Sequence, residues 1–319
     1  MKNTDYVKAA SSIFLKKNRE MTGNGPTETA FNNYMILLNR ALLSEGIDIG
    51  LPHYWFTAGD EVLISAIPYI HRNCGDVGST MVTFDGGRPE FDPHDRVISL
   101  ADGFAEGFIK KYAGTEGQMD AADDIYDYAP FNFQNDFRRL MGALMGPWEN
   151  DCIEGPPHDI AGLFNILMES FPSEFGYLSA HFERFASTFS LALSRNVGPE
   201  GLLEVAETFW TFFCHHLRLE SLCHHNIPPS TLTSWKEMLP EEEGQYTMFV
   251  QNQAAEYCPP GGCIDPVIEG LLRDRDVRLR ESDSLFRKVF CRKESKARRR
   301  PTFFISPITR PSCSFRADE

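Results

Sequence analysis

The sequence predicts a mainly α-helical protein in which a winged-helix-like α+β unit precedes an antiparallel helical bundle. Three observations support this fold class. Apolar side chains recur at helical spacing over most of the chain. Near residue 80 the pattern changes to β-branched and aromatic residues beside a glycine turn. Glycine and proline gather between residues 146 and 158, and the lengths on either side are each sufficient for a domain.

Three helices are predicted before the change of pattern. The first covers residues 5–19, and the second runs from near Thr27 to Gly46, a residue type that favours helix C-termini. A third, short helix is predicted within residues 57–66, because Thr57 and its neighbours offer an N-terminal cap. The second helix is the best supported, since its apolar residues follow i, i+3, i+4 and i+7 spacing: Phe31, Tyr34, Met35, Leu38, Ala41 and Leu42.

One β-hairpin is predicted next, with residues 79–84 as its first strand. Asp85-Gly86-Gly87 supplies the turn, because glycine adopts positive φ without strain, and a second short strand extends to Phe91. Asp92-Pro93 then predicts the start of another helix. Helix, helix, helix, hairpin and helix is the order of a winged-helix-like unit.

The predicted domains are residues 1–146, which form the α+β unit, and residues 159–291, which form the bundle. Helices over residues 120–128 and 133–145 complete the first domain. Residues 147–158 are the linker, and residues 292–319 are a basic tail predicted to be disordered, because helical periodicity is lost there. Short polar connections favour an antiparallel bundle. Its predicted helices cover residues 159–171, 173–195, 199–225, 230–239, 241–257 and 265–290.

The net charge of −14 conceals an uneven distribution. Residues 287–319 carry ten Lys or Arg and three Asp or Glu, a net of +7, so the rest of the chain has a net of −21. A body this acidic repels a phosphate backbone, which restricts nucleic-acid contact to a local patch or to the tail. In the tail, the candidate contacts are Lys296, Arg298, Arg299 and Arg300. A solvated tail, or one folded against the acidic body, is the competing interpretation.

Hydropathy predicts a cytoplasmic protein without a membrane partner. No apolar signal region follows Met1, and no uncharged apolar run approaches the roughly 20 residues that cross a bilayer. The eight cysteines are widely spread, and without a signal region they are predicted to be reduced thiols.

An aromatic segment, residues 53–56, is the first candidate contact surface. It consists of His53, Tyr54, Trp55 and Phe56. Aromatic residues dominate the energetics of protein–protein interfaces, so Tyr54, Trp55 and Phe56 are predicted to bind another protein, whose identity the sequence does not indicate. Interior packing between the first helices and the hairpin is the competing interpretation.

A second cluster, Cys214-His215-His216 and Cys223-His224-His225, contains residue types that bind zinc. On a single helix over residues 199–225, only His216 and Cys223 lie on the same apolar side. Cys258 and Cys263 would have to complete a four-ligand zinc site. The leading interpretation is that His216 and Cys223 pack in a seam between helices, so no cofactor is predicted and zinc is the alternative.

Residues 51–62 (Leu-Pro-His-Tyr-Trp-Phe-Thr-Ala-Gly-Asp-Glu-Val) and 128–134 (Tyr-Ala-Pro-Phe-Asn-Phe-Gln) resemble a group of uncharacterised archaeal proteins. The first segment is also similar to the Panacea-type antitoxin domain, where a helix leads into an aromatic-rich strand and a glycine turn. Gly59-Asp60-Glu61-Val62 stands where that family has a Gly-Pro-Val turn. Panacea proteins neutralise partner proteins and are not enzymes, so the resemblance implies an interaction role for the N-terminal half.

These patterns together predict a non-enzymatic interaction or regulatory protein. The chain lacks Gly-x-Ser-x-Gly, His-Glu-x-x-His and a phosphate loop ending in Gly-Lys-Ser or Gly-Lys-Thr. The third predicted helix carries Asp60 and Glu61 without a basic residue, which opposes phosphate and predicts a protein-contact version of the winged-helix-like unit. A nucleic-acid-associated regulator acting through the tail, and a zinc protein or zinc enzyme, are the two alternatives.

Overall fold

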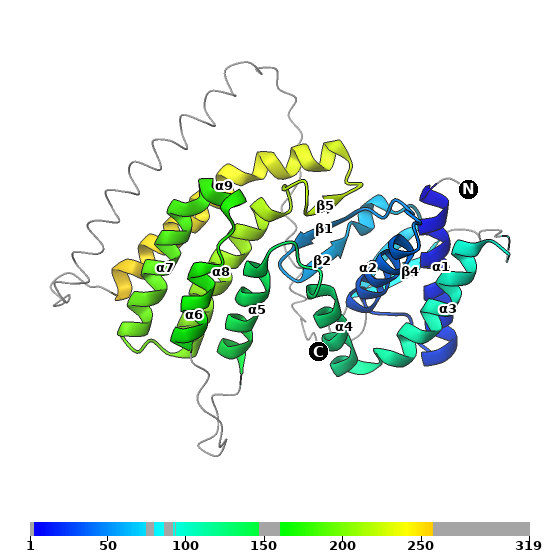
Figure 1. The fold of residues 1–319 in the computed structure, drawn as a ribbon, viewed down its shortest axis with the longest axis horizontal. Helices are drawn as coiled ribbons and strands as arrows, with labels where there is room; N and C mark the ends of the chain where they lie inside the picture. The colour runs from blue at the N-terminus through cyan, green and yellow to red at the C-terminus, as the bar shows by residue number, and fades with distance from the viewer. Residues whose placement is uncertain (1–2, 75–79, 86–91, 93, 147–159, 258–319) are drawn as a thin grey trace, which may run out of the picture.

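The computed structural model describes residues 3–74, 80–85, 92, 94–146 and 160–257, and this part of the chain is mainly helical with small antiparallel sheets (Figure 1). The sequence predicted this mainly helical character. The elements in chain order are α1 (Asn3–Thr22), α2 (Glu28–Ser44), β1 (His53–Phe56), β2 (Gly59–Val62), η1 (Ile64–Ala66), β3 (Ile70–Cys74), β4 (Thr80–Phe84), α3 (Arg96–Lys111), α4 (Gly114–Tyr126), α5 (Asn132–Met145), α6 (Ile160–Glu169), η3 (Ser173–Leu178), α7 (Ser179–Ser194), α8 (Pro199–Leu217), β5 (His224–His225) and α9 (Pro229–Tyr257).

Side-chain caps define the starts of two helices in the first half. The hydroxyl of Thr27 accepts a hydrogen bond from the N–H of Ala30 at 3.2 Å, which confirms the predicted start of α2. The carboxylate of Asp95 accepts from the N–H of Val97 at 2.8 Å and caps α3. The predicted start of this helix at Asp92-Pro93 is therefore too early, because Asp95 satisfies the first free amides of the helix.

Residues 59–62 form strand β2 and not the predicted third helix. β2 pairs antiparallel with β1, and only Ile64–Ala66 is helical, as a single 3-10 turn. Gly59 opens β2 with φ of 119°, a conformation that is strained for residues with a Cβ, and the Tyr126 ring packs against it. Val62 and Ile64 are buried, but Leu63 between them is apolar too, and a short apolar run does not separate a strand from a helix in the sequence.

β4 pairs antiparallel with β3, which precedes it in the chain, so that Ile70 lies opposite Phe84. The sequence did not predict β3, because His71, Arg72 and Asn73 interrupt the apolar alternation. The predicted second strand of the hairpin, up to residue 91, lies outside the described residues. Two strand pairs follow α2 in place of one helix and one hairpin, so the described order departs from the winged-helix-like order.

The elements form two groups that lie next to each other: α1–α4 with the strands, and α5–α9 (Figure 1). α5, which belongs to the first of the two predicted domains, packs against α6 and α8. β5 follows α8 but pairs with β1 of the first group. The buried apolar residues form one continuous cluster from Val7 to Val250, so the two groups share a core. The predicted linker at residues 147–158 lies outside the described residues.

The second half is helical as predicted, with three corrections. The helix predicted over residues 173–195 begins as the 3-10 helix η3, and the α-helix α7 starts only at Ser179. α8 ends at Leu217 and not at residue 225, so His224 and His225 belong to a strand. The helices predicted over residues 230–239 and 241–257 are one helix, α9, which continues through Pro240. Proline removes one N–H donor from a helix, and the packing of α9 against α7 and α8 offsets this loss. The helix predicted over residues 265–290 lies outside the described residues.

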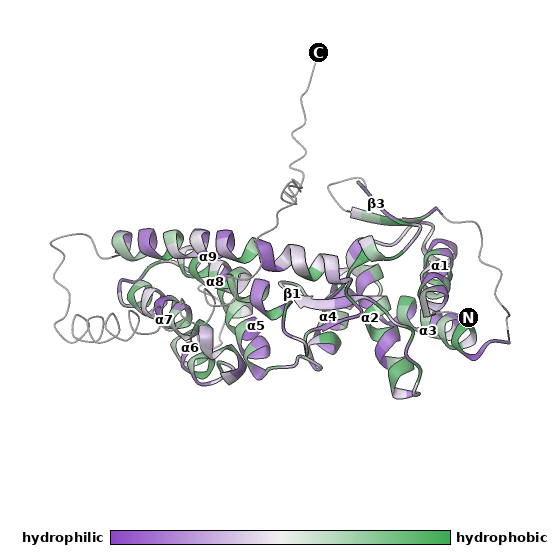
Figure 2. Ribbon diagram, turned by 90° about the horizontal axis from the view of Figure 1, so that it is seen from above, coloured by the Kyte–Doolittle hydropathy of each residue, from purple (hydrophilic) through white to green (hydrophobic). Residues whose placement is uncertain are grey.

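Phenylalanine fills the core of the second group. Phe209 stacks on Phe185 with ring centres 4.5 Å apart, and Phe133 meets Phe213 at 5.0 Å. Figure 2 shows hydrophobic and hydrophilic residues alternating along the helices, as expected of amphipathic helices around a core. None of the described helices combines the length and the apolar character that crossing a membrane requires.

Candidate functional site

The two clusters that the sequence singles out lie against each other in the structure (Figure 1). β5 pairs with β1 so that His53 is opposite His225 and Tyr54 is opposite His224. The N–H of Trp55 donates to the carbonyl of Cys223 at 2.8 Å. The aromatic segment and the Cys/His segment are far apart in the sequence, and only the tertiary fold brings them together.

Trp55, predicted to bind a partner, belongs to the core of the described structure. Its side chain is 4% exposed, and its ring packs edge-on against that of Tyr126 on α4 at 5.3 Å. A partner cannot reach this indole in the described conformation. Tyr54 and Phe56 point to the opposite face of β1, because side chains alternate along a strand, and both are half-buried there.

The face of the sheet that carries Tyr54 and Phe56 packs against α8 and α9. The Tyr54 ring lies 4.7 Å from that of Trp235 on α9. The Phe56 ring meets the imidazole of His215 edge-on at 5.2 Å. These predicted partner-binding residues thus join the sheet to the second group of helices and are half-buried in that contact.

The other face of the sheet carries a buried ion network. His53 Nδ1 lies 2.7 Å from Oδ1 of Asp60, and Arg40 donates to Oδ2 of the same carboxylate at 3.0 Å. Asn32 donates to the carbonyl of Asp60 and accepts from the N–H of Val62. An Asp that orients a His also occurs in catalytic groupings. Here both groups are buried and connect α2 to β1 and β2, which supports a structural role.

His216 and Cys223, the predicted metal pair, are both buried but in different surroundings. His216 is in the last turn of α8, with Nδ1 3.4 Å from the hydroxyl of Tyr177. Cys223 follows the end of α8 and contacts β1 through its backbone, so the single helix predicted to carry both is wrong. Within the described ranges, no three His, Cys, Asp or Glu side chains converge as metal ligands. Cys258 and Cys263 lie outside those ranges.

Burial keeps the Cys/His cluster uncharged. It lowers the pKa of His215 and of His216 to about 3, so both imidazoles are neutral at pH 7. It also raises the pKa of the Cys214 and Cys223 thiols. Since the thiolate is the reactive form, neither cysteine is an activated nucleophile in this environment.

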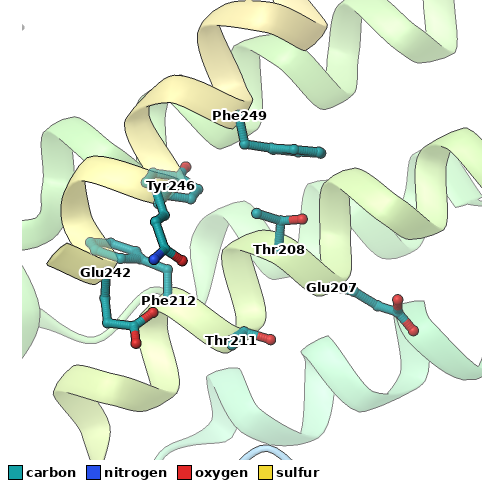
Figure 3. A pocket seen from close by; sticks show the side chains of 8 residues that line it. Glu207, Thr208, Thr211, Phe212, Glu242, Tyr246 and Phe249 are labelled. Carbon is teal, nitrogen blue, oxygen red and sulfur yellow. The ribbon is translucent and has the colours of Figure 1, made fainter. Parts of the chain in front are cut away.

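A groove with a volume of about 420 Å³ lies between α8 and α9, near this cluster (Figure 3). Its floor is aromatic: Phe212 stacks on Tyr246 with ring centres 4.4 Å apart. The hydroxyl of Tyr246 donates to the carbonyl of His181 at 2.8 Å, which holds the floor in place. The lining residues are Glu207, Thr208, Thr211 and Phe212 from α8, and Glu242, Gln245, Tyr246 and Phe249 from α9.

The groove is acidic. Two carboxylates line it, Glu207 on α8 and Glu242 on α9, and neither Lys nor Arg is among its lining residues. Glu242 Oε2 lies 3.5 Å from Nε2 of the neutral His215, and burial raises the pKa of Glu242. Carboxylates above a fixed aromatic floor suit a cation with an apolar stem, such as the side chain of Lys or Arg.

Arg218 was not among the candidate residues predicted from the sequence, but it lies beside both clusters. It caps the C-terminus of α8 and is 6% exposed. Its guanidinium carbon lies 5.1 Å from the centre of the Phe56 ring and 4.8 Å from that of Trp235. A single basic residue next to a Cys/His cluster does not indicate a cation–π site in the sequence. Only the fold brings the rings of Phe56 and Trp235 against Arg218.

One wall of the groove, on α8, is indicated by a pattern in the sequence. Glu204, Glu207, Thr208 and Thr211 follow helical spacing and form a polar stripe along α8. Such a stripe predicts an exposed helix face, but it does not indicate that α9 runs beside it. The predicted nucleic-acid contacts in the tail, Lys296 and residues 298–300, lie outside the described residues.

The described part of the chain defines a mainly helical protein with small antiparallel sheets and an acidic groove between two helices. No family model, no curated protein and no solved structure matches the chain. The resemblance to Panacea-type domains therefore stays a prediction from the sequence.

Proposed function

We propose that this chain is a non-enzymatic, cytoplasmic interaction protein that binds a basic segment of another protein in the groove between α8 and α9. The observation that carries the proposal is the groove's combination of an aromatic floor with carboxylates and without lining Lys or Arg. Binding of that segment would regulate the partner if the partner is active only when the segment is free.

The size and chemistry of the groove favour side chains of a peptide over a large ligand. A volume of about 420 Å³ is at the small end of the range of ligand pockets. A Lys or Arg stem can lie against the ring of Phe249, which is half-buried in the lining, while its charged head approaches Glu207 or Glu242. Thr208 and Gln245 add hydrogen-bonding groups for a peptide backbone.

The charge of the whole chain supports the same class of partner. Outside residues 287–319 the chain has a net charge of −21, so a basic partner is attracted over a distance before it reaches the groove. Charged groups at the edge of an interface mainly increase the association rate and make it dependent on salt. We therefore expect binding to weaken as ionic strength rises.

The test is a titration of the full-length protein with a fluorescent peptide rich in Lys and Arg, and with a peptide in which Gln replaces each of these residues. We expect the basic peptide alone to bind. Glu207→Gln and Glu242→Gln together should weaken that binding about three- to tenfold, because exposed charge pairs contribute roughly 0.2–1 kcal/mol each.

The matched control is Glu169→Gln, which removes one charge from an exposed position on α6, outside the groove. It should leave peptide affinity unchanged, and circular dichroism should show that each variant is folded. Equal binding of the two peptides by the wild type would refute the proposal. So would a loss of affinity in Glu169→Gln as large as that in the groove variants.

A further inference from the structure

The acidic residues of the described helices are concentrated on α8 and α9, the two helices that form the groove. Together these helices carry eight Glu and one Lys, a net charge of −7. The next most acidic helix, α4, has a net charge of −4, and α1, α3 and α5 are each net positive. A basic segment is therefore attracted to α8 and α9 more strongly than to the other described helices.

This chain contains a basic segment of its own. Residues 292–300 hold six Lys or Arg and one Glu, a net charge of +5, and they lie outside the described residues. Three of the basic residues, 298–300, are consecutive arginines. Each has the long apolar stem and charged head that suit the half-buried aromatic ring and the two carboxylates of the groove. The segment therefore has the chemistry that the groove is proposed to recognise in a partner.

The groove lies within reach of this segment. α9 ends at Tyr257 beside the first turn of α8, where a Cβ on Gly201 would lie 3.4 Å from the Tyr257 hydroxyl. At 1.5 Å per residue, Tyr257 is about 12 Å from Phe249 and about 22 Å from Glu242 along α9. Arg292 follows Tyr257 by 35 positions, and a chain of that length can extend to about 115 Å. The connection is therefore long enough for the segment to bind the groove of its own molecule.

We propose that residues 292–300 occupy the groove between α8 and α9 and compete there with the basic segment of the partner. This inference rests on the proposed function, because the two segments share one site. The connection through the chain gives residues 292–300 a high effective concentration at the groove, so weak ion pairs are sufficient for occupancy. A partner must displace this segment before it binds, which makes the groove autoinhibited.

The first test is cross-linking of the full-length protein with a carbodiimide, which joins an amine to a carboxylate only where the two groups are in direct contact. Mass spectrometry of the monomeric fraction identifies the joined residues. We expect the amine of Lys296 to be joined to the carboxylate of Glu207 or of Glu242, because these two side chains line the groove. Restriction to the monomeric fraction excludes contacts between two molecules.

A tail variant with Arg298→Gln, Arg299→Gln and Arg300→Gln keeps Lys296 as the reporter but removes three charges from the segment. The yield of the Lys296 cross-link to the groove should fall about threefold or more, because exposed charge pairs are weak one by one and three are lost together. An equal yield in the tail variant and the wild type would overturn the proposal.

The matched control variant carries Arg19→Gln, Lys110→Gln and Arg139→Gln. It loses the same charge from exposed positions on α1, α3 and α5, outside the groove, and should keep the wild-type yield. Circular dichroism should show that both variants are folded. Cross-links of Lys296 that are spread evenly over surface carboxylates, or directed mainly to α4, would also overturn the proposal.

The second test repeats the titration with the fluorescent basic peptide. The tail variant should bind this peptide about two- to fivefold more tightly than the wild type and the control variant, because its groove is free. Equal affinity for all three proteins would show that the segment does not compete. Failure of the proposed function gives a different result, since the tail variant would then not bind the peptide at all. In that case the Lys296 cross-link alone decides whether the segment occupies the groove.

Discussion

His53 Nδ1 lies 2.7 Å from Oδ1 of Asp60 on the buried face of the β1–β2 pair. The two residues occupy a diagonal pair across neighbouring strands, which places their side chains within reach on one face. Arg40 completes the network from α2 by donating to the second oxygen of Asp60. This carboxylate therefore holds two strands and a helix together, and its charge is neutralised where solvent is excluded.

Asp60→Asn should destabilise the fold strongly. The substitution removes the charge that compensates Arg40 and leaves one acceptor oxygen where Asp60 has two, so His53 and Arg40 cannot both keep their contacts. Breaking a buried ion pair costs about 3–5 kcal/mol. Urea unfolding measures the change. Asp123→Asn is the control, because the Asp123 side chain is 66% exposed and pairs with Arg138 at the surface. It should cost at most about 1 kcal/mol, and similar losses in both variants would contradict the structural role of Asp60.

Trp55→Ala should reduce stability and not only partner capture. The side chain is 4% exposed and packs on Tyr126, so its removal leaves a cavity that costs about 3–5 kcal/mol in the free energy of unfolding. Leu222→Ala, at a position that is 61% exposed, should change stability by less than about 0.5 kcal/mol. A Trp55→Ala protein as stable as the wild type would show that the indole is not part of the core.

Stability should fall as the pH is lowered from 6.5 towards 3. Burial lowers the pKa of His215 and of His216 to about 3, so in this range the unfolded chain binds protons that the folded chain does not. Each histidine then decreases the free energy of unfolding by about 1.4 kcal/mol per pH unit. Glu61 acts in the opposite direction between pH 7 and 4.5, because its raised pKa favours protonation of the folded state.

His216→Gln tests this assignment, because glutamine is polar and does not titrate. The slope of unfolding free energy against pH should become shallower by about 1.4 kcal/mol per pH unit over this range. His94→Gln, at an exposed position, is the control and should keep the slope of the wild type. Unchanged slopes in both variants would mean that the His216 imidazole is protonated in the folded protein.

Gly59→Ala should destabilise the β1–β2 pair. Gly59 has φ of 119°, and a Cβ at this position would lie 3.1 Å from Cε2 of Tyr126. Strain of this kind costs about 1–3 kcal/mol. Gly142→Ala is the matched control within α5, where a Cβ meets no atom within 4 Å, and it should stabilise the protein by about 0.5–1 kcal/mol. Thermal unfolding separates the two, and equal effects would exclude strain at Gly59.

The sequence predicted several helices and their starts well, because these signals are local. The stripe of Phe31, Tyr34, Leu38 and Leu42 defines α2 from spacing alone, and Thr27 marks its start. α5 and α8 begin close to their predicted positions for the same reason. The predictions were wrong where a short segment is compatible with both helical and strand periodicity, as in β2. They were also wrong where polar residues interrupt the apolar pattern of a strand, as in β3.

The candidate sites were less predictable, because each depends on contacts between distant segments. His216 and Cys223 are buried as the sequence predicted, but the end of α8 separates them into different environments. Trp55 was selected as a contact because aromatic residues are common in interfaces, and the core uses the same residue types. The sequence contains no feature that distinguishes these two roles.

The sequence by itself determined the helical class, the position of the main helices and the acidity of the body, because periodicity and charge are properties of neighbouring residues. Only the tertiary structure decided that β5 pairs with β1, that α9 lies beside the polar stripe of α8, and that Arg218 lies against Phe56 and Trp235. These arrangements depend on which surfaces bury each other. That choice is made by the whole chain in three dimensions, and no local pattern of residues encodes it.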